Sequence, residues 1–204
     1  MIKANHKVRS DLDIIVNWIP NNSRLLDLAC GEGELLARLK QDKQVEGYGL
    51  EIDNRQINAC IQNNVNAIYQ DITQGLDNFA DASFDMVVMT QALQVMREPH
   101  KVLADMLRIG KECIVTFPNF GHWKARWHLL TKGRMPVSDL LPYEWYDTPN
   151  IHFCTFKDFE VLCHEMDIDV LHREVVAEAG LGEQLKNVQP NLFGVTALYH
   201  LRKK

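Results

Sequence analysis

The feature that most constrains the fold is a glycine turn between a short apolar strand and a helix. Residues 25–28 form an apolar run typical of a buried strand, Gly31 and Gly33 interrupt it, and a helical pattern follows. Glycines let the backbone turn sharply and approach a ligand with no Cβ in the way. A second strand, residues 45–52, carries Glu51 twenty residues after Gly31, where a carboxylate can accept hydrogen bonds from ribose hydroxyls. This order predicts a nucleoside site in a βαβ unit.

The residues around the turn narrow the class of nucleoside. A dinucleotide-binding turn has a third glycine three residues after the second, and Leu36 occupies that position here. Asp27 lies just before the turn, where its charge would repel a pyrophosphate and could instead pair with an ammonium group. S-adenosylmethionine has a ribose, an adenine, a sulfonium and an amino-acid end, and it carries no phosphate. The pattern therefore favours this ligand over a dinucleotide.

The rest of the chain alternates helix and strand patterns. We expect helices at residues 10–19, with Ser10 as N-cap, and at 35–40, 55–63, 99–107 and 158–166. Further strands are expected at residues 64–69, 84–89, 112–117, 169–176 and 195–201. Such alternation predicts a mostly parallel sheet with right-handed crossovers. Ligands of such sheets bind at the carboxyl ends of the strands.

Length and composition are those of one soluble globular domain over residues 1–204. The net charge of −5 offers no basic surface for nucleic acid. No apolar run reaches the roughly 18 residues of a membrane span, and the polar N-terminus lacks a signal-peptide core. The five cysteines are scattered without a Cys-x-x-Cys pair, as expected for reduced thiols. We therefore expect a cytoplasmic protein.

The turn resembles the first motif of the class I S-adenosylmethionine-dependent methyltransferases, an acidic residue followed by three residues and Gly-x-Gly. The motif here reads Asp-Leu-Ala-Cys-Gly-Glu-Gly over residues 27–33, with alanine where the family often has glycine. The resemblance implies a Rossmann-like α/β fold with a seven-stranded, mostly parallel sheet and helices on both faces. It implies that Glu51 holds the ribose, Ile52 packs on the adenine and Asp71 meets the adenine amino group. The implied set that binds S-adenosylmethionine or S-adenosylhomocysteine is Asp27, Ala29, Gly31, Gly33, Glu51, Ile52, Asp71, Ile72 and Gln91.

Two acids at the strand ends, and the glycines of the turn, have a purely structural alternative. Asp53 fits the N-cap of the following helix better than a ligand contact. Asp71 could cap a turn instead of meeting the adenine. The glycines themselves could make a tight turn in a different α/β fold, and this alternative stays open beside the ligand site.

Residues 119–155 form a second informative stretch, because they are too long for a simple connection and rich in Trp, Tyr, His, Arg and Pro. Such an insertion suits a substrate lid or a protein interface, or a surface loop whose aromatics complete the core. Residues His122, His152, Cys154 and His164 match no metal-ligand spacing, so we expect no metal site. The candidates for a substrate or partner surface are Asn119, Trp123, Tyr143, Trp145, Tyr146 and Asn150.

Six segments resemble the MetW family of methionine biosynthesis proteins, in a match from about residue 8 to the C-terminus. They are residues 26–36, 49–53, 91–94, 117–123, 145–152 and 189–193. The run Trp-Tyr-Asp-Thr-Pro-Asn-Ile-His at 145–152 is much more specific than Gly-x-Gly. The resemblance implies a bacterial cytoplasmic protein that accompanies a homoserine O-acyltransferase of the α/β-hydrolase type and supports O-succinylhomoserine formation. It assigns no methyl acceptor.

Two function classes follow from these expectations. In the first, the chain is a regulatory subunit that binds S-adenosylmethionine or S-adenosylhomocysteine and contacts the acyltransferase through residues 119–152 and the loop 178–193. In the second, it is an active small-molecule methyltransferase, with His122 and His152 as candidate bases and Tyr143 and Asn119 as orienting groups. The residues after the fourth strand lack the Asn-Pro-Pro-Tyr type signature of amino-group methylation. A homodimer through the aromatic insertion is a further alternative.

Overall fold

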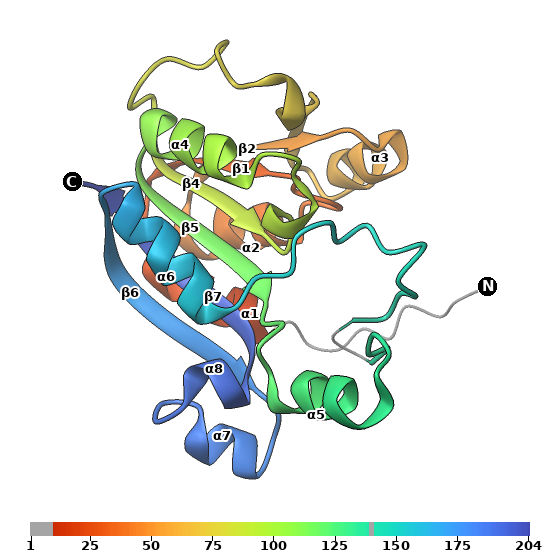
Figure 1. Cartoon of the computed structure of the whole chain (residues 1–204). Coiled ribbons are helices and arrows are strands. Elements are labelled where there is room, and N and C mark those ends of the chain that lie inside the picture. The colour runs from red at the N-terminus through yellow and green to blue at the C-terminus, as the bar shows by residue number, and fades with distance from the viewer. Residues whose placement is uncertain (1–9, 139–140) are drawn as a thin grey trace.

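The structure is a computed structural model that describes residues 10–138 and 141–204 (Figure 1). Seven strands form one sheet in the order β3-β2-β1-β4-β5-β7-β6. Strands β1 to β5 pair in parallel, whereas β7 is antiparallel to both β5 and β6. The predicted seven-stranded, mostly parallel sheet is therefore confirmed. The strands are β1 (Arg24–Leu28), β2 (Glu46–Glu51), β3 (Asn66–Tyr69), β4 (Phe84–Thr90), β5 (Gly110–Pro118), β6 (Ile168–Ala177) and β7 (Gly194–Lys203).

Helices cover both faces of this sheet, with α4 and α6 in front and α1 and α2 behind in Figure 1. The α-helices are α1 (Ser10–Trp18), α2 (Glu34–Lys43), α3 (Asn54–Gln62), α4 (Pro99–Ile109), α5 (Trp123–Lys132), α6 (Phe156–Glu165), α7 (Leu181–Leu185) and α8 (Pro190–Phe193). Two 3₁₀ turns, η1 (Ile72–Gln74) and η2 (Leu93–Val95), follow β3 and β4. Within the described ranges, no helix has the length and apolar character needed to cross a membrane.

Successive residues of the central strands point into opposite layers. Leu25 and Val88 are buried in the cluster that includes the apolar faces of α1 and α2. Leu26 and Val87 are buried in the cluster that includes the apolar faces of α4 and α6. Because both faces of the sheet are covered, the central strands favour apolar residues on both of their faces, which explains their nearly continuous apolar runs.

The observed elements differ from the predicted ones at a few places. Ser10 is already a helical residue of α1, so its predicted N-cap role is wrong. Helices α5, α7 and α8 are additional to the predicted elements. The segment 178–193, expected to be a loop, therefore contains two short helices.

The two ends of the insertion at residues 119–155 lie side by side. The Phe120 amide donates to the carbonyl of Cys154, and the Phe120 and Phe153 rings lie 4.5 Å apart. Between these contacts the chain passes through α5 and a long connection that leads back to α6 (Figure 1). The insertion is thus a long loop with adjoining ends, located after the carboxyl end of β5.

Candidate functional site

The glycine turn lies where the strand order reverses, at the carboxyl end of β1 between β2 and β4. Leu28 pairs with Leu50 of β2 and with Met89 of β4, so the three strands end together. The turn then passes through Ala29, Gly31 and Gly33, whose φ angles are +58°, +58° and +75°. This position is the crevice in which ligands of open α/β sheets bind.

Glu51, the last residue of β2, ties its strand to the turn. One carboxylate oxygen accepts from the Gly31 amide at 3.0 Å, and the other accepts from the amides of Ile52 and Asp53 at 2.8 and 3.0 Å. Since a carboxylate offers about four acceptor positions, one remains for a ribose hydroxyl, and a second hydroxyl must replace or share a backbone donor. Ile52 is 54% exposed beside this carboxylate, an unusual position for a large apolar side chain.

The charges around the turn are negative. Asp27 is only 1% exposed, near the end of β1. Burial raises the pKa of the Cys30 thiol, and the charges of Asp27 and Glu51 raise it further. Burial and the same two acids also raise the pKa of Cys60. Burial disfavours any charged group here, whereas the charges of Asp27 and Glu51 disfavour only anions and would favour a cationic group at the same place.

Leu36 and two glycines of β2 replace the third glycine of a dinucleotide turn. A Cβ built on Gly47 would lie 2.4 Å from Leu36 Cδ2, and one on Gly49 would lie 3.1 Å from Leu36 Cδ1. Helix α2 can therefore pack closely on the sheet because the two glycines of β2 have no side chains. This geometry explains how α2 keeps a leucine at a position where the dinucleotide pattern has glycine.

The two acids with a structural alternative both cap helices. Asp53 accepts from the Arg55 amide at 2.8 Å as N-cap of α3, as predicted. Asp71 accepts from the amide and hydroxyl of Thr73 at 2.9 and 2.7 Å as N-cap of η1. The hydrogen bonds from Thr73 hold the pKa of Asp71 below its usual value. The cap is present, and the contact of Asp71 with an adenine stays a prediction.

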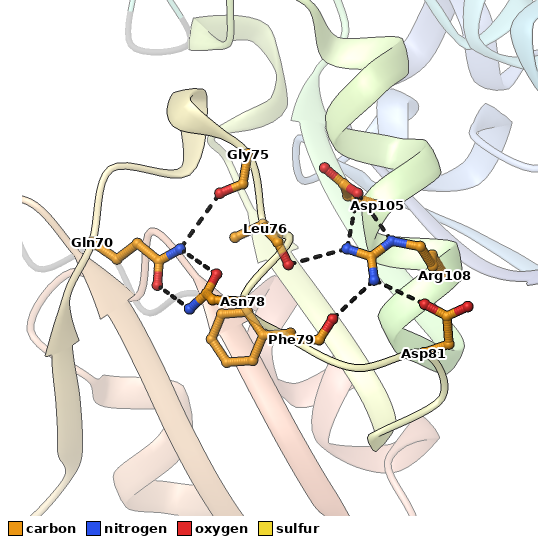
Figure 2. A network of polar contacts seen from close by, with 8 residues as sticks. All are labelled: Gln70, Gly75, Leu76, Asn78, Phe79, Asp81, Asp105 and Arg108. Carbon is orange, nitrogen blue, oxygen red and sulfur yellow. Dashed lines mark hydrogen bonds and ion pairs between the residues drawn. The ribbon is translucent and has the colours of Figure 1, made fainter.

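Arg108 of α4 fixes the segment between β3 and β4, as Figure 2 shows. It donates to the carbonyls of Leu76 and Phe79 at 3.0 and 2.9 Å. It also forms ion pairs with Asp81 at 2.9 Å and with Asp105 at 3.2 Å. This network was not predicted, because a lone arginine on an amphipathic helix usually indicates a solvated face.

A pair of side-chain amides holds the other end of the same segment (Figure 2). Gln70 and Asn78 exchange hydrogen bonds of 2.9 and 3.0 Å, and Gln70 also donates to the Gly75 carbonyl at 3.4 Å. The residues expected on the adenine side, Asp71 and Ile72, lie within the loop that these contacts close. Their position is therefore defined by the fold without a ligand.

Gln91 and Gln94 connect the end of β4 to the insertion. Gln91 has φ +55°, and its amide donates to Thr116 of β5. Gln94 is buried, and its side chain donates to the Gln91 carbonyl at 2.8 Å. The carbonyl of Gln94 accepts from the amides of Ile151 and His152, both at 3.0 Å. The end of the insertion thus lies against the candidate ligand site.

The two candidate bases lie on different parts of the structure. His122 precedes α5, is 3% exposed and lines a cavity of about 220 Å³ with Glu178. Burial lowers the pKa of His122. His152 is exposed, and its Nε2 lies 3.2 Å from the Arg97 carbonyl. The structure does not bring the two imidazoles together at the glycine turn.

One of the residues predicted for the substrate or partner surface is not on the surface, and contact of the others with a substrate or partner stays a prediction. Asn119 is fully buried: its amide group donates to the carbonyls of Asn191 and Gly194 and accepts from the Gly121 amide, which joins β5 to the start of β7. Asn150 is half-buried. The remaining predicted residues are exposed, namely Trp123, Tyr143, Trp145 and Tyr146.

Helix α5 adds Trp127 and Leu130 to Trp123, which was already a candidate for the substrate or partner surface. Trp123, Trp127 and Leu130 are 42%, 61% and 78% exposed. They lie four and three residues apart, so they share one face of the helix. The signal was present as an apolar helical period, with Lys124, His128 and Lys132 on another face of the helix. We call Trp123, Trp127 and Leu130 the α5 face.

Solved structures with a similar fold include S-adenosylmethionine-dependent methyltransferases. One from Archaeoglobus fulgidus has a TM-score of 0.71 at 15% identity and covers 95% of this chain and 91% of its own. One from Mesorhizobium loti has a TM-score of 0.67 at 14% identity, with 95% and 96% covered. The [4+2]-cyclase SpnF matches with a TM-score of 0.65 at 18% identity, with 94% and 80% covered. At these identities the likeness shows the fold.

Sequence similarity adds a family to this fold. The bifunctional methionine biosynthesis protein MetXA/MetW of Rhodopirellula baltica is 31% identical over 198 residues, which are 92% of this chain and 32% of that protein. The chain therefore spans about a third of the length of this relative. The family model described as "Methionine biosynthesis protein MetW" matches residues 9–201. The chain thus belongs to the MetW family of methionine biosynthesis proteins, built on the fold of S-adenosylmethionine-dependent methyltransferases.

Proposed function

We propose that the chain is a regulatory subunit of a homoserine O-acyltransferase in the cytoplasm and supports formation of O-succinylhomoserine. The observation that carries this proposal is the Rhodopirellula baltica relative, whose name joins MetXA and MetW in one protein. We take its MetXA part to be the acyltransferase that the family resemblance implies. Fusion into one chain keeps each module at a high effective concentration near the other, which is an advantage when the two modules act together.

The glycine turn is the proposed site for S-adenosylmethionine or S-adenosylhomocysteine, which acts as a signal. Asp27 would pair with the ammonium group, Glu51 with the ribose, Ile52 with the adenine ring and Asp71 with its amino group. The carboxylate of Glu51 is already held by three backbone amides, which supports this assignment. The exposed Ile52 and the negative charge around the turn also agree with a cationic nucleoside.

The α5 face is the proposed contact for the acyltransferase. Trp side chains are enriched in protein interfaces, and exposed apolar side chains that adjoin one another, as Trp and Leu do here, mark interaction sites. The exposed aromatics Trp145 and Tyr146 in the same insertion extend this surface. A second copy of the chain is the alternative occupant, and it would make the α5 face a dimer interface.

The hydrogen bonds of Gln94 offer a physical route between the two sites. Gln94 contacts Gln91 on the ligand side and the amides of Ile151 and His152 on the insertion side. A ligand that changes the position of Gln91 would therefore act on the insertion. Because such coupling is reciprocal, the acyltransferase would change the affinity for the ligand by the same factor. Since S-adenosylmethionine is made from methionine, this coupling would be end-product feedback.

The test is acyl-coenzyme A consumption by the acyltransferase, titrated with the purified chain. We expect a saturating rise in rate that ends near a stoichiometric ratio. Glu51→Ala should lose the ligand-dependent part of this rise, whereas Glu46→Ala, at the opposite end of β2, should behave as the unaltered chain. No change in rate at any ratio would contradict the proposal.

A second candidate function is methyl transfer to a small acid, favoured by the methyltransferases among the solved structures of similar fold. Methyl transfer is a displacement at an activated carbon, so the protein mainly has to position the acceptor and exclude water. The cyclase SpnF cautions that this fold also hosts other chemistry. Release of S-adenosylhomocysteine that depends on an added acceptor would favour this function. Its absence with chain that binds the ligand would favour the regulatory subunit.

A further inference from the structure

A cavity outside the glycine turn lies where α5 meets the connection that follows it. Its volume is about 600 Å³, and its wall includes His128 and Lys132 of α5 together with Arg134, Glu144 and Trp145. None of these five residues belongs to the strand ends that form the candidate ligand site. A cavity of this size accommodates a ligand as large as a nucleotide.

Positive charge is concentrated around this cavity. Residues 119–137 contain four Lys and Arg and no Asp or Glu, although the chain as a whole has a net charge of −5. Lys124 forms an ion pair, and Arg126 donates to a backbone carbonyl. Lys132 and Arg134 have no ion pair among the residues that the structure describes, and both line the cavity. Two such cations on one wall favour a ligand that carries phosphate.

Two further residues narrow the class of ligand. Trp145 is 73% exposed and has one edge-to-face contact, with Tyr146 at 5.8 Å between ring centroids, so much of its indole is open to a planar ring. Glu144 places a carboxylate in the same cavity. This carboxylate would repel a bare phosphate and would accept hydrogen bonds from an amino group. The ligand that satisfies all of these side chains has phosphate, a flat ring and an amino group on the ring.

We propose that this cavity binds a phosphorylated adenosine. Lys132 and Arg134 hold the phosphates, Trp145 stacks on the adenine and Glu144 accepts from its amino group. Two sources have this chemistry, the nucleotide end of coenzyme A and a free adenine nucleotide. The first source rests on the proposed function, because the acyltransferase consumes an acyl-coenzyme A, whereas the second is independent of it.

The test is titration of the purified chain with coenzyme A, adenosine 3′,5′-bisphosphate, ADP and inorganic phosphate, followed by calorimetry. We expect saturable binding that the double variant Lys132→Gln/Arg134→Gln weakens at least about tenfold and Trp145→Leu weakens about fivefold. The matched control Lys203→Gln removes a positive charge on β7 and should bind as the unaltered chain. All of the substituted residues are exposed, so the variants should fold and keep the circular dichroism spectrum of the unaltered chain.

The four probes separate the sources. Tighter binding of coenzyme A and the bisphosphate than of ADP supports coenzyme A, and equal binding supports a free nucleotide. Three results would overturn the proposal: no saturation with any adenosine probe, phosphate binding as tightly as the nucleotides, or equal affinity in the double variant.

A repeat with Glu51→Ala shows which site is measured. If the adenosine ligands still bind to Glu51→Ala, the result supports binding in the cavity beside α5. If their binding is lost, the adenosine binds at the glycine turn and the proposal is overturned. The acyltransferase titration is run in parallel with the unaltered chain. If the chain activates the acyltransferase but binds neither coenzyme A nor a nucleotide, the cavity proposal is rejected and the proposed function stands. If the chain binds one of these ligands but does not activate the acyltransferase, the cavity proposal stands and the proposed function is rejected.

Discussion

Single residues of the glycine turn adopt backbone conformations that most side chains avoid. An L-residue in the left-handed region costs about 1 kcal/mol, and Ala29 bears this cost at φ +58°. This cost explains why the class I methyltransferases often have glycine at the matching position. Gly33 has a second constraint, since a Cβ there would lie 3.0 Å from Cys60 Sγ and 3.1 Å from Val65 Cγ1.

We expect Gly33→Ala to lower the free energy of unfolding by about 2–3 kcal/mol, from backbone strain and from crowding against α3. Gly133→Ala is the matched control, because Gly133 also has a positive φ of +60° but has no atom within 4 Å of a built Cβ. It should cost about 1 kcal/mol. Chemical denaturation measures both variants, and equal costs would show that the contact with Cys60 and Val65 yields without strain.

His200 should make stability depend on pH. Burial holds the pKa of His200 below its ordinary value of 6.5, despite the Glu112 carboxylate 2.6 Å away. Below pH 6.5 the unfolded chain takes up a proton that the folded chain resists, so stability falls as pH falls. We expect His200→Phe, which keeps an aromatic ring beside Trp18, to lose stability less steeply between pH 6.5 and 5. Parallel slopes in urea denaturation at these pH values would contradict this expectation.

At the scale of elements, the sequence predicted what is buried and local. The strand at 84–89 was predicted because β4 is apolar on both faces, and the Asp53 cap was predicted because its partner is two residues away. Helix α5 was missed because its large apolar residues face outward and only Ala125 is buried. The Arg108 network was missed because its carbonyl partners are 29 and 32 residues distant, and a sequence pattern carries no record of such contacts.

Arg108→Ala should destabilise the chain by about 1–2 kcal/mol, because two backbone carbonyls and two carboxylates lose a charged donor. It should also weaken the binding of S-adenosylhomocysteine, because the segment that carries Asp71 and Ile72 loosens. Lys101→Ala, which removes an exposed pair between Lys101 of the same helix and its N-cap residue Glu98, should cost under about 0.5 kcal/mol. Thermal unfolding and calorimetry would test both effects, and unchanged ligand affinity in Arg108→Ala would argue against the adenine-side role.

The α5 face should bind the acyltransferase without contributing to the stability of the chain. We expect Leu130→Ser to weaken acyltransferase binding about tenfold with no change in melting temperature, since Leu130 is 78% exposed. Ile61→Ser is the matched control, because Ile61 is a similarly exposed apolar residue on α3, outside the insertion. Biolayer interferometry with immobilised acyltransferase gives the affinities. Equal weakening by both variants would mean that the contact is not specific to α5.

At the scale of the whole molecule, hydrogen bonds connect the insertion to the candidate ligand site. The insertion is closed at Phe120 and Cys154 and is bonded to Gln94 beside the end of β4. The turn and the acid at the end of β2 could be predicted from the sequence because they lie within one βαβ pattern, and the fold could be predicted from the alternation of helices and strands along the chain and from the family resemblance. The hydrogen bonds between Gln94 and the insertion could not be predicted from the sequence, because they join backbone groups more than fifty residues apart.

The most direct test of a ligand-responsive subunit is the dissociation constant of its complex with the acyltransferase, measured with and without saturating S-adenosylhomocysteine. The account predicts a change of about fivefold or more, as expected for allosteric coupling of at least 1 kcal/mol. This change should disappear in Glu51→Ala and persist in Glu46→Ala. Equal dissociation constants with and without the ligand, in chain shown to bind it, would contradict the account.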